Sequence, residues 1–440
     1  MGTTSPLSTA AIERPDSIVK EPPIAPSQAT PGSPAARSEE PRQRRSATRI
    51  SRGLSKVVTA CSLLLAIPLV LLARVMRPFL LIRFGPLPSQ RIGPFAANVE
   101  VYVCEREAGL HGRRAIDLFY CAEPVCNRQL QTMWSRVIPI MKFARALEWV
   151  NRWVPGAAPH QIPMRRDGDR DLHGLVARTL PHLAFTAEEL DRGWGLLGEL
   201  GIEPGIPFVC FQARDAAYLH AMFPERDWTY HDYRNVDIRT MVPAIEALTR
   251  RGYLAVRMGA VVNEALPVVH PRIIDYSLKG RTEFLDIFLA AHCRFFLGDP
   301  SGIMALPMVF RRPWALVNEI PFEYLHTWGR HTLTIPKTLW LRQERRFMTF
   351  REILESGVGR RFHRSEQYEQ AGIEVIENTP EDIAAVAVEM DERLKGTWRT
   401  TDEDDRLQCR FWALFTSSPL NGVLQARVGA EFLRQHRHLL

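Results

Sequence analysis

Arginine, aspartate and histidine side chains gather in two short stretches of the sequence where chemistry can take place. Arg214 and Asp215 end the segment FVCFQARD, which begins with an apolar run. His231 lies in the segment WTYHDYRNVDI. A guanidinium group can hold a phosphate through two parallel hydrogen bonds, and a carboxylate or imidazole can accept a proton from a hydroxyl group. We therefore predict that Arg214, Asp215 and His231 are catalytic. An ion pair at a strand end and a loop that satisfies its own polar groups are the alternatives.

Further candidate binding residues lie in the same loop or follow later apolar runs. They are Tyr233, Arg234, Asn235, Arg257, Gly259, Ser301, Gly302 and Glu319. Arginine and glycine suit the close approach of a phosphate, and free N–H groups at a helix start near Ser301 suit a diphosphate. Glu319 suits a ribose hydroxyl. Ordinary turns and a helix cap remain the alternatives for these positions.

Arg91, Gly93 and Asn98 precede the other candidates by more than a hundred residues. We predict that they form the opposite wall of a cleft.

Several well-known motifs are missing from the sequence. It contains no Walker A loop, no G-x-G-x-x-G fingerprint and no G-x-S-x-G elbow, which disfavours P-loop hydrolysis, nicotinamide redox chemistry and the serine-hydrolase elbow. Asp167 and Asp169 form a D-x-D pair that can hold a metal on a sugar nucleotide, but flanking arginines favour a solvated turn. The seven cysteines are odd in number and irregularly spaced, so we expect free thiols and no zinc site. We expect neither a metal nor a cofactor.

The elements that must position these residues alternate between strand and helix patterns. Strand patterns occur at 206–215, 253–259, 272–277, 294–299 and 313–320, and helix patterns at 241–252, 282–293, 301–310 and 380–395. Such alternation predicts a doubly wound parallel sheet, which binds its ligands beyond the carboxyl ends of the strands.

The preceding part of the chain has a less regular pattern. Short strands are predicted at 99–103 and 116–120, helical spacing runs through 133–153, and a helix is predicted at 187–200. Gly201 is a plausible end for that last helix. This part is predicted to be a second α/β domain.

The N-terminal part of the chain differs in composition from the rest. Residues 1–52 are rich in Pro, Ser and Arg and are predicted to be disordered. Six basic residues and no acid lie in 42–56, directly before an apolar run at 57–73. We predict a membrane anchor, spanning or re-entrant, at 53–83, with a buried soluble helix as the alternative. The globular part is then expected on the cytoplasmic face of a membrane.

The formal net charge of +7 belongs to this N-terminal part, because the remainder of the chain carries equal numbers of basic and acidic residues. This distribution argues against nucleic-acid binding. The predicted organisation is a tail at 1–52, an anchor at 53–83, an N-terminal acceptor-side α/β domain at 84–203, a C-terminal Rossmann-like domain at 204–400 and an extension at 401–440.

The ordered segments FVCFQARD, DWTYHDYRN, GYLAVRMG, TEFLDIFLAAHCRFFLGDPSG and MVFRRPWALVN resemble a family of bacterial glycosyltransferases from surface-polysaccharide loci, as does QRIGPFAANVEVYV. The family is distantly similar to O-fucosyltransferase-like enzymes, whose GT-B architecture has two Rossmann-like domains facing a cleft. The resemblance covers roughly 84–400. It differs at Gln212 and Pro94, where the family usually has histidine.

The resemblance implies hexosyl or deoxyhexosyl transfer from a nucleotide sugar to a surface polysaccharide or glycolipid acceptor, without a metal. Arg214, Asp215 and His231 would be catalytic, and the residues from Tyr233 to Glu319 listed above would bind the donor. The missing histidines keep an alternative open, in which the chain is a non-catalytic, membrane-anchored partner that binds sugar nucleotides or polysaccharide.

Overall fold

The computed structural model describes residues 61–440, except 113, 166–167 and 416–419. The described residues form one compact unit. The predicted tail, 1–52, and the first part of the predicted anchor, 53–60, lie outside the described residues. All seven cysteines are free thiols, as predicted.

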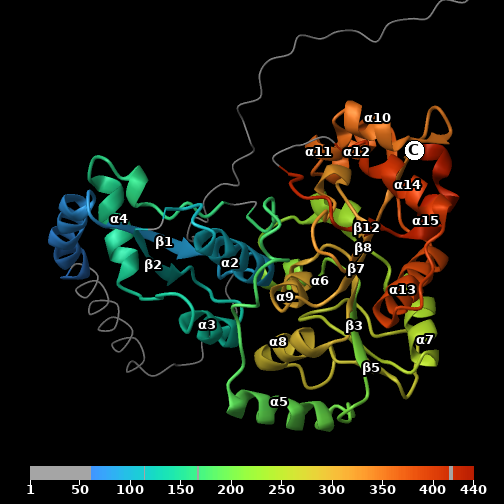
Figure 1. Cartoon of the computed structure of the whole chain (residues 1–440), viewed down its shortest axis with the longest axis horizontal. Helices are drawn as coiled ribbons and strands as arrows, with labels where there is room; N and C mark the ends of the chain where they lie inside the picture. The colour runs from blue at the N-terminus through green and yellow to red at the C-terminus, as the bar shows by residue number, and fades with distance from the viewer. Residues whose placement is uncertain (1–60, 113, 166–167, 416–419) are drawn as a thin grey trace, which may run out of the picture. The chain divides into compact units, whose positions relative to one another are not determined.

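A seven-stranded parallel sheet forms the centre of the C-terminal part (Figure 1). Its spatial order is β12, β8, β7, β6, β3, β4, β5, and every neighbouring pair is parallel. The strands are β3 (Phe208–Gln212), β4 (Leu254–Arg257), β5 (Ile273–Asp275), β6 (Phe296–Gly298), β7 (Trp314–Glu319), β8 (Thr332–Pro336) and β12 (Arg427–Val428). The predicted doubly wound sheet is confirmed. Its strand order reverses between β3 and β6, which is where such sheets bind ligands.

Helices cover both faces of this sheet, so its strands are apolar on both sides. In β3, Cys210 faces the core shared with α8 (Glu283–His292) and α9 (Ala305–Val309). Its neighbour Phe211 faces the core shared with α7 (Val242–Arg250) and α13 (Pro380–Lys395). Figure 1 shows α8 and α9 on one side of the sheet and α7 and α13 on the other. The predicted helices at 241–252, 282–293 and 380–395 are therefore confirmed.

The N-terminal region is smaller than a Rossmann-like domain. A single β-α-β unit consists of β1 (Leu81–Leu87), α2 (Ile92–Glu107) and β2 (Ala115–Cys121), with the two strands paired in parallel. Three further helices follow: α3 (Arg128–Ser135), α4 (Ala144–Trp153) and α5 (Ala187–Glu199). The predicted strand at 116–120 and helix at 187–200 are confirmed. The helical pattern at 133–153 belongs to two helices rather than one.

The predicted strand at 99–103 is wrong, because these residues lie in the middle of α2. Every residue of α2 from Phe95 to Cys104 is buried. A helix that is buried all round lacks the amphipathic period that usually reveals it, and its β-branched residues are typical of a strand. Tertiary packing therefore outweighs local propensity here.

The two regions share one hydrophobic core, in contrast to the predicted pair of Rossmann-like domains facing a cleft. Helix α2 packs on α9, and α3 packs on α8. A Cβ atom on Gly93 would lie 2.9 Å from the Cα of Gly302, so glycine lets the two backbones approach closely. The starts of α2 and of the segment after β6 therefore lie against each other.

A smaller sheet and several further helices complete the C-terminal part. A three-stranded antiparallel sheet has the order β10, β9, β11. Its strands and the remaining helices are β9 (Thr338–Leu341), β10 (Arg346–Phe347), β11 (Ile373–Ile376), α6 (Ala217–Met222), α10 (Phe350–Glu355), α11 (Val358–Arg361), α12 (Ser365–Gln370), α14 (Asp402–Trp412) and α15 (Ala430–Gln435). The predicted extension, 401–440, contributes β12 to the main sheet and α14 to its core.

Short 3₁₀ helices connect several of these elements. They are η1 (Ala158–His160), η2 (Thr229–Arg234), η3 (Ile238–Met241), η4 (Gly302–Met304), η5 (Phe322–Tyr324) and η6 (Arg437–Leu439).

Residues 61–76 of the predicted anchor are helical. Ala66, Val70 and Ala73 form the buried face of this helix and pack against Leu147 and Val150 of α4. Within the described residues, none of the helices combines the length and hydrophobicity needed to cross a bilayer.

Candidate functional site

The loops after β3 and β6 meet at the point where the strand order reverses. Gln212 ends β3 and pairs in register with Gly298 at the end of β6. The backbone N–H of Arg214 donates to Oδ2 of Asp299 at 2.5 Å, and Oγ of Ser301 donates to Oε1 of Gln212 at 2.5 Å. These bonds hold the two loops side by side at the predicted ligand-binding edge.

The DYRN segment folds around Arg214. Nη1 of Arg214 donates to the side-chain oxygen of Asn235 and, at 3.4 Å, to the carbonyl of His231. Nδ2 of Asn235 donates in turn to Asp232 at 2.8 Å. Nη2 of Arg234 donates to the carbonyl of Pro300 at 2.7 Å, which joins the loop after β3 to the loop after β6. Residues far apart in the sequence thus form one cluster, as predicted from the strand ends.

Positive groups outnumber the buried carboxylates in this cluster. Burial and the neighbouring Arg234 lower the pKa of Arg214 to about 10. Burial lowers the pKa of His231 to about 3, with further contributions from Arg234, Arg214, Arg91 and Arg364. His231 is therefore neutral at pH 7, because a further proton would lie among arginines.

Three polar atoms of the cluster have no partner among the described residues. Nδ1 of His231, Nε of Arg234 and Oδ1 of Asp299 are all buried without a hydrogen bond. A buried polar atom without a partner is costly, and polar atoms of this kind are commonly satisfied by a ligand or water. The arrangement is suited to an anion that accepts hydrogen bonds.

Asp299 and Lys337 belong to the cluster but were not among the predicted site residues. Burial raises the pKa of Asp299 to about 6, although Arg214, Arg234 and Lys337 act in the opposite direction. Burial lowers the pKa of Lys337 to about 8, and its Nζ donates to the carbonyls of Tyr233 at 3.1 Å and Asn235 at 2.7 Å. Asp299 was visible in the sequence segment GDPSG. Lys337 follows β8, a strand that the sequence analysis did not identify.

An open pocket of about 240 Å³ lies beside the cluster, beyond the ends of β3 and β4. The predicted residues Asp215, Asn235 and Arg257 line it, together with acidic side chains of Asp237, Glu264 and Glu377. Such a lining offers many oxygen acceptors for hydroxyl and N–H donors.

Asp215 and Arg257 are already engaged within this pocket. Oδ1 and Oδ2 of Asp215 accept N–H bonds from Ala217 at 2.8 Å and Asn263 at 3.0 Å. Arg257 is buried and donates to the carbonyl of Glu264 at 2.7 Å and to Asp275 at 3.2 Å. Both side chains therefore shape the pocket wall.

Tyr233 and Glu319 are buried in packing and hydrogen-bond networks. The ring of Tyr233 lies 5.3 Å from that of Tyr368. Oε2 of Glu319 accepts from the backbone N–H of His326 at 3.0 Å and pairs with its Nδ1 at 2.7 Å, while Oε1 accepts from Thr334. These contacts give Glu319 a role in holding the loop after β7.

The alternative reading of Ser301, a helix cap, does not hold for its side chain. The segment after β6 begins as η4, and the Ser301 side chain bonds Gln212 rather than the helix start. Among the acceptor-side candidates, Arg91 precedes α2 and contributes to the field at His231, and Gly93 contacts Gly302. Asn98 lies further along α2 and donates to the carbonyl of Arg165 at 3.3 Å. Gly259 lies two residues after β4, close to Val262.

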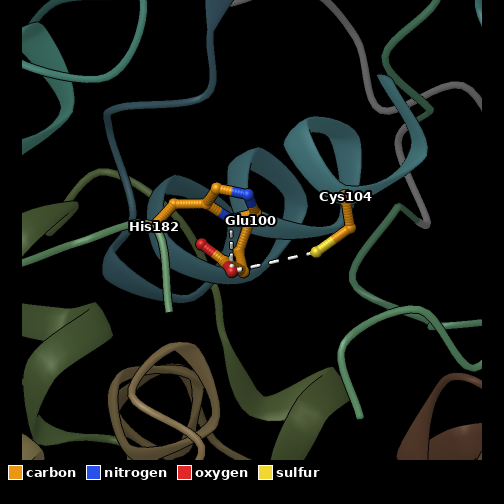
Figure 2. A group of neighbouring side chains, drawn as sticks. All are labelled: Glu100, Cys104 and His182. Atoms are coloured by element: carbon orange, nitrogen blue, oxygen red, sulfur yellow. Dashed lines mark hydrogen bonds and ion pairs between the residues drawn. The ribbon is translucent and has the colours of Figure 1, made fainter. Parts of the chain in front are cut away.

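Glu100, Cys104 and His182 form the one group in the described residues with the spacing of metal ligands. Figure 2 shows His182 and Cys104 on either side of the Glu100 carboxylate. Nδ1 of His182 lies 2.8 Å from Oε1 of Glu100, and Nη2 of Arg311 donates to the same oxygen at 2.5 Å. Both cationic groups contact Oε1 of Glu100, whereas its Oε2 is buried without a partner among the described residues. Asp167 lies outside the described residues, and Asp169 is exposed.

Comparisons with known proteins give only remote similarities. No family model and no curated protein matches the chain. The chain is similar to the E. coli ADP-heptose LPS heptosyltransferase II, with 12% identity, a TM-score of 0.38, and coverage of 57% of this chain and 88% of that one. It is also similar to a glycosyl transferase family 9 protein from Veillonella parvula, with 11% identity, a TM-score of 0.37, and coverage of 58% and 84%. Because both TM-scores lie below 0.5, the candidate site is argued from this chain's own residues.

Proposed function

We propose that the chain is a glycosyltransferase that uses a nucleoside-diphosphate sugar as its donor. The observation that carries the proposal is the excess of buried positive charge where the sheet order reverses. Arg214, Arg234 and Lys337 surround a single buried carboxylate, Asp299, and burial together with the charges of Arg234 and Arg214 keeps His231 neutral. A diphosphate supplies the missing negative charge, and guanidinium groups bind its oxygens well.

The proposed reaction places the diphosphate at these cations. The bond between the sugar C1 and the diphosphate oxygen breaks, and its electron pair stays on that oxygen. Arg214 and Arg234 stabilise the developing negative charge, so the proposal needs no metal. The oxygen of an acceptor hydroxyl forms the new bond to C1, and its proton passes to a base.

His231 is the base that we propose for this step. It is neutral in the ligand-free protein, and its Nδ1 has no hydrogen-bond partner among the described residues. The negative charge of the bound diphosphate offsets the arginine charges that lower its pKa, so the ring becomes a stronger base when the donor is bound. Asp215, the other predicted base, has both oxygens engaged by backbone N–H groups. We assign Asp215 a positioning role for the loop at 263.

The pocket of about 240 Å³ is the proposed site of the nucleoside. It shares Asn235 with the cation cluster, and its acidic lining suits ribose hydroxyls and base N–H groups. These acids replace Glu319 as proposed ribose ligands, because the oxygens of Glu319 are occupied. Arg91 and Gly93 remain on the proposed acceptor side. The proposed acceptor is a surface polysaccharide or glycolipid, and the proposed sugar is a hexose or deoxyhexose.

A second candidate function is a binding partner that recognises the sugar nucleotide without turning it over. Gln212 favours this alternative, because the family that the sequence resembles usually has histidine there. The Gln212 side chain is held by Ser301 and offers no titratable group. Both candidates share the same binding site and differ only in turnover.

Thermal unfolding of the full chain with UDP-, GDP-, dTDP- and CMP-sugars, with and without EDTA, tests the proposal. We expect one diphosphate donor to raise the melting temperature without a metal, by about 2.7 kcal/mol of stabilisation at a hundredfold excess over its Kd. Arg214→Ala should abolish this shift. Arg342→Ala is the matched control, because Arg342 is exposed and pairs with Glu374 on the small antiparallel sheet.

Slow release of nucleoside diphosphate separates the two candidates. Donor hydrolysis that Arg214→Ala abolishes supports the enzyme, whereas tight binding without hydrolysis or transfer supports the binding partner. If no nucleotide sugar shifts the melting temperature of the folded chain, both candidates are wrong.

A further inference from the structure

The outer face of the helix at 61–76 is apolar and has no partner in the described structure. Six large side chains between residues 64 and 79 leave 49–74% of their surface exposed: Leu64, Leu65, Leu71, Leu72, Val75 and Phe79. A contiguous group of this kind is unusual on a monomeric soluble protein and typically marks an interaction site.

The inner face attaches this helix firmly to the N-terminal region. Ala66, Val70 and Ala73 are buried against α4, and Nη2 of Arg74 donates to Oδ1 of Asn151 at 2.6 Å. Figure 1 shows the helix, in blue, beside α4. Small residues on the packed face and large ones on the outer face give the helix two surfaces, of which only one is used within the chain.

Helix α4, which packs on the inner face of this helix, carries exposed aromatic and basic side chains of its own. Trp149 and Trp153 are exposed, and the centroids of their rings lie 5.4 Å apart. Arg145 and Arg152 are also exposed, whereas the nearby acid Glu148 is buried and paired with Arg152. We call Trp149, Trp153 and the six side chains above the apolar patch. Tryptophan and arginine at the edge of an apolar surface are typical of proteins that lie in a membrane interface.

We propose that the apolar patch docks onto the surface of an anionic lipid bilayer, with the helix at 61–76 lying in the plane of the interface. Charge complementarity selects this occupant. Residues 57–83 contain three arginines and no acid, and the six basic residues at 42–56 directly precede them in the sequence. A second copy of the chain would bring the same basic residues together, which is unfavourable.

A surface-bound helix explains the composition of the segment without a membrane crossing. Both ends of the helix then lie on one side of the bilayer, and the compact unit stays on that side. The cytoplasmic leaflet is the proposed surface, because it carries the anionic lipids that attract basic residues. This inference is independent of the proposed enzymatic function.

Co-flotation of the full chain with vesicles tests the proposal. We expect strong binding to phosphatidylcholine vesicles that contain phosphatidylglycerol and weaker binding to phosphatidylcholine alone. Leu65→Glu combined with Leu72→Glu should lower the binding about tenfold or more. Leu180→Glu combined with Val269→Glu is the matched control, because these side chains are exposed outside the patch and their change should leave binding intact.

Two further variants separate the electrostatic and apolar contributions. Arg77→Glu combined with Arg145→Glu should weaken binding to the anionic vesicles by about fivefold per residue. Vesicles with bromine atoms on shallow acyl positions should quench tryptophan fluorescence, and Trp149→Phe combined with Trp153→Phe should remove most of that quenching. All variants change exposed residues, so unchanged melting temperatures check that the fold is kept.

Three results would overturn the proposal. The first is that the chain does not bind anionic vesicles at all. The Leu65→Glu and Leu72→Glu variant can bind as well as the unchanged chain, which would assign binding to the basic tail alone. A dimer in solution that the same variant dissociates would assign the patch to a second copy of the chain.

Discussion

Two partly buried histidines lie in opposite electrostatic surroundings. His182 faces Cys104 and the carboxylate of Glu100, and hydrogen bonds to them raise its pKa to about 10. His231 faces arginines, and burial together with their charges lowers its pKa to about 3. The same side chain is therefore a cation in one region and neutral in the other at pH 7.

The difference distinguishes a cluster in which two cations share a carboxylate from one in which cations outnumber the buried acid. Around Glu100, the protonated His182 and Arg311 both contact Oε1 of a buried carboxylate, and this cluster joins α2 to the segment after α9; only Oε2 of Glu100 has no partner among the described residues. Around Arg214, positive groups outnumber the buried acid, and three polar atoms are unsatisfied among the described residues. The first arrangement stabilises the fold, and the second is suited to a ligand.

Removing the carboxylate that His182 and Arg311 share should have the largest effect on the stability of the fold. Glu100→Gln leaves His182 and Arg311 facing each other without a negative charge, and breaking a buried ion pair in this way costs about 3–5 kcal/mol. Urea denaturation should show this loss in the free energy of unfolding.

Glu107→Gln provides the control for this prediction. Glu107 also pairs with His182, at 3.1 Å, but its side chain is 58% exposed. Its replacement should cost only about 0–1 kcal/mol. Equal losses in the two variants would contradict the view that burial of Glu100 stabilises the cluster.

A change in the cluster around Arg214 should alter ligand binding rather than the stability of the fold. Arg234→Gln removes one cation from beside Arg214 and His231, so we expect the affinity for a nucleoside diphosphate to fall about 10- to 100-fold. The melting temperature of the ligand-free chain should stay the same or rise, because like charges no longer repel. Calorimetric titration and thermal unfolding measure the two effects.

Arg342→Gln serves as the matched exposed control and should change neither quantity. A variant at Arg234 that melts earlier but binds as before would show that its bond to Pro300 is structural.

The smallest effect concerns the pH dependence of stability. The two histidines contribute to it in opposite pH ranges. The folded pKa of His231 lies below its ordinary value of 6.5, so its contribution to stability is present above pH 6.5 and is lost as pH falls toward 3. The folded pKa of His182 is raised, so its contribution is present below pH 6.5 and is lost as pH rises toward 10. We expect His231→Asn to flatten the acidic side of the profile and His182→Asn the alkaline side.

The measurement is the difference in the free energy of unfolding between each variant and the unchanged chain at each pH. Asp299 acts against His231 on the acidic side, because its raised pKa of about 6 makes the folded chain take up a proton first. Subtraction removes that contribution. The comparison of the two clusters fails if both variants flatten the same side of the profile.

Much of the C-terminal fold could be predicted from local pattern. Strands such as β3 and β6 are short apolar runs that end in polar residues, and the helices between them have clear periods or caps. Arg214 and the DYRN segment were found because they follow or flank such runs. Helix α2 was missed because its burial on all sides hides the helical period.

The sequence by itself determined the alternation of strands and helices, the residues at the strand ends and the apolar segment at 57–73. These features depend on neighbours along the chain, because hydrophobic period and turn residues act locally. The tertiary structure alone decided that β3 and β6 lie side by side and that Lys337 joins Arg214 and Asp299. Strand order is set by packing between distant segments, and a side chain's charge environment follows from that packing. For this reason His182 and His231 differ in charge at pH 7 although they are the same type of residue.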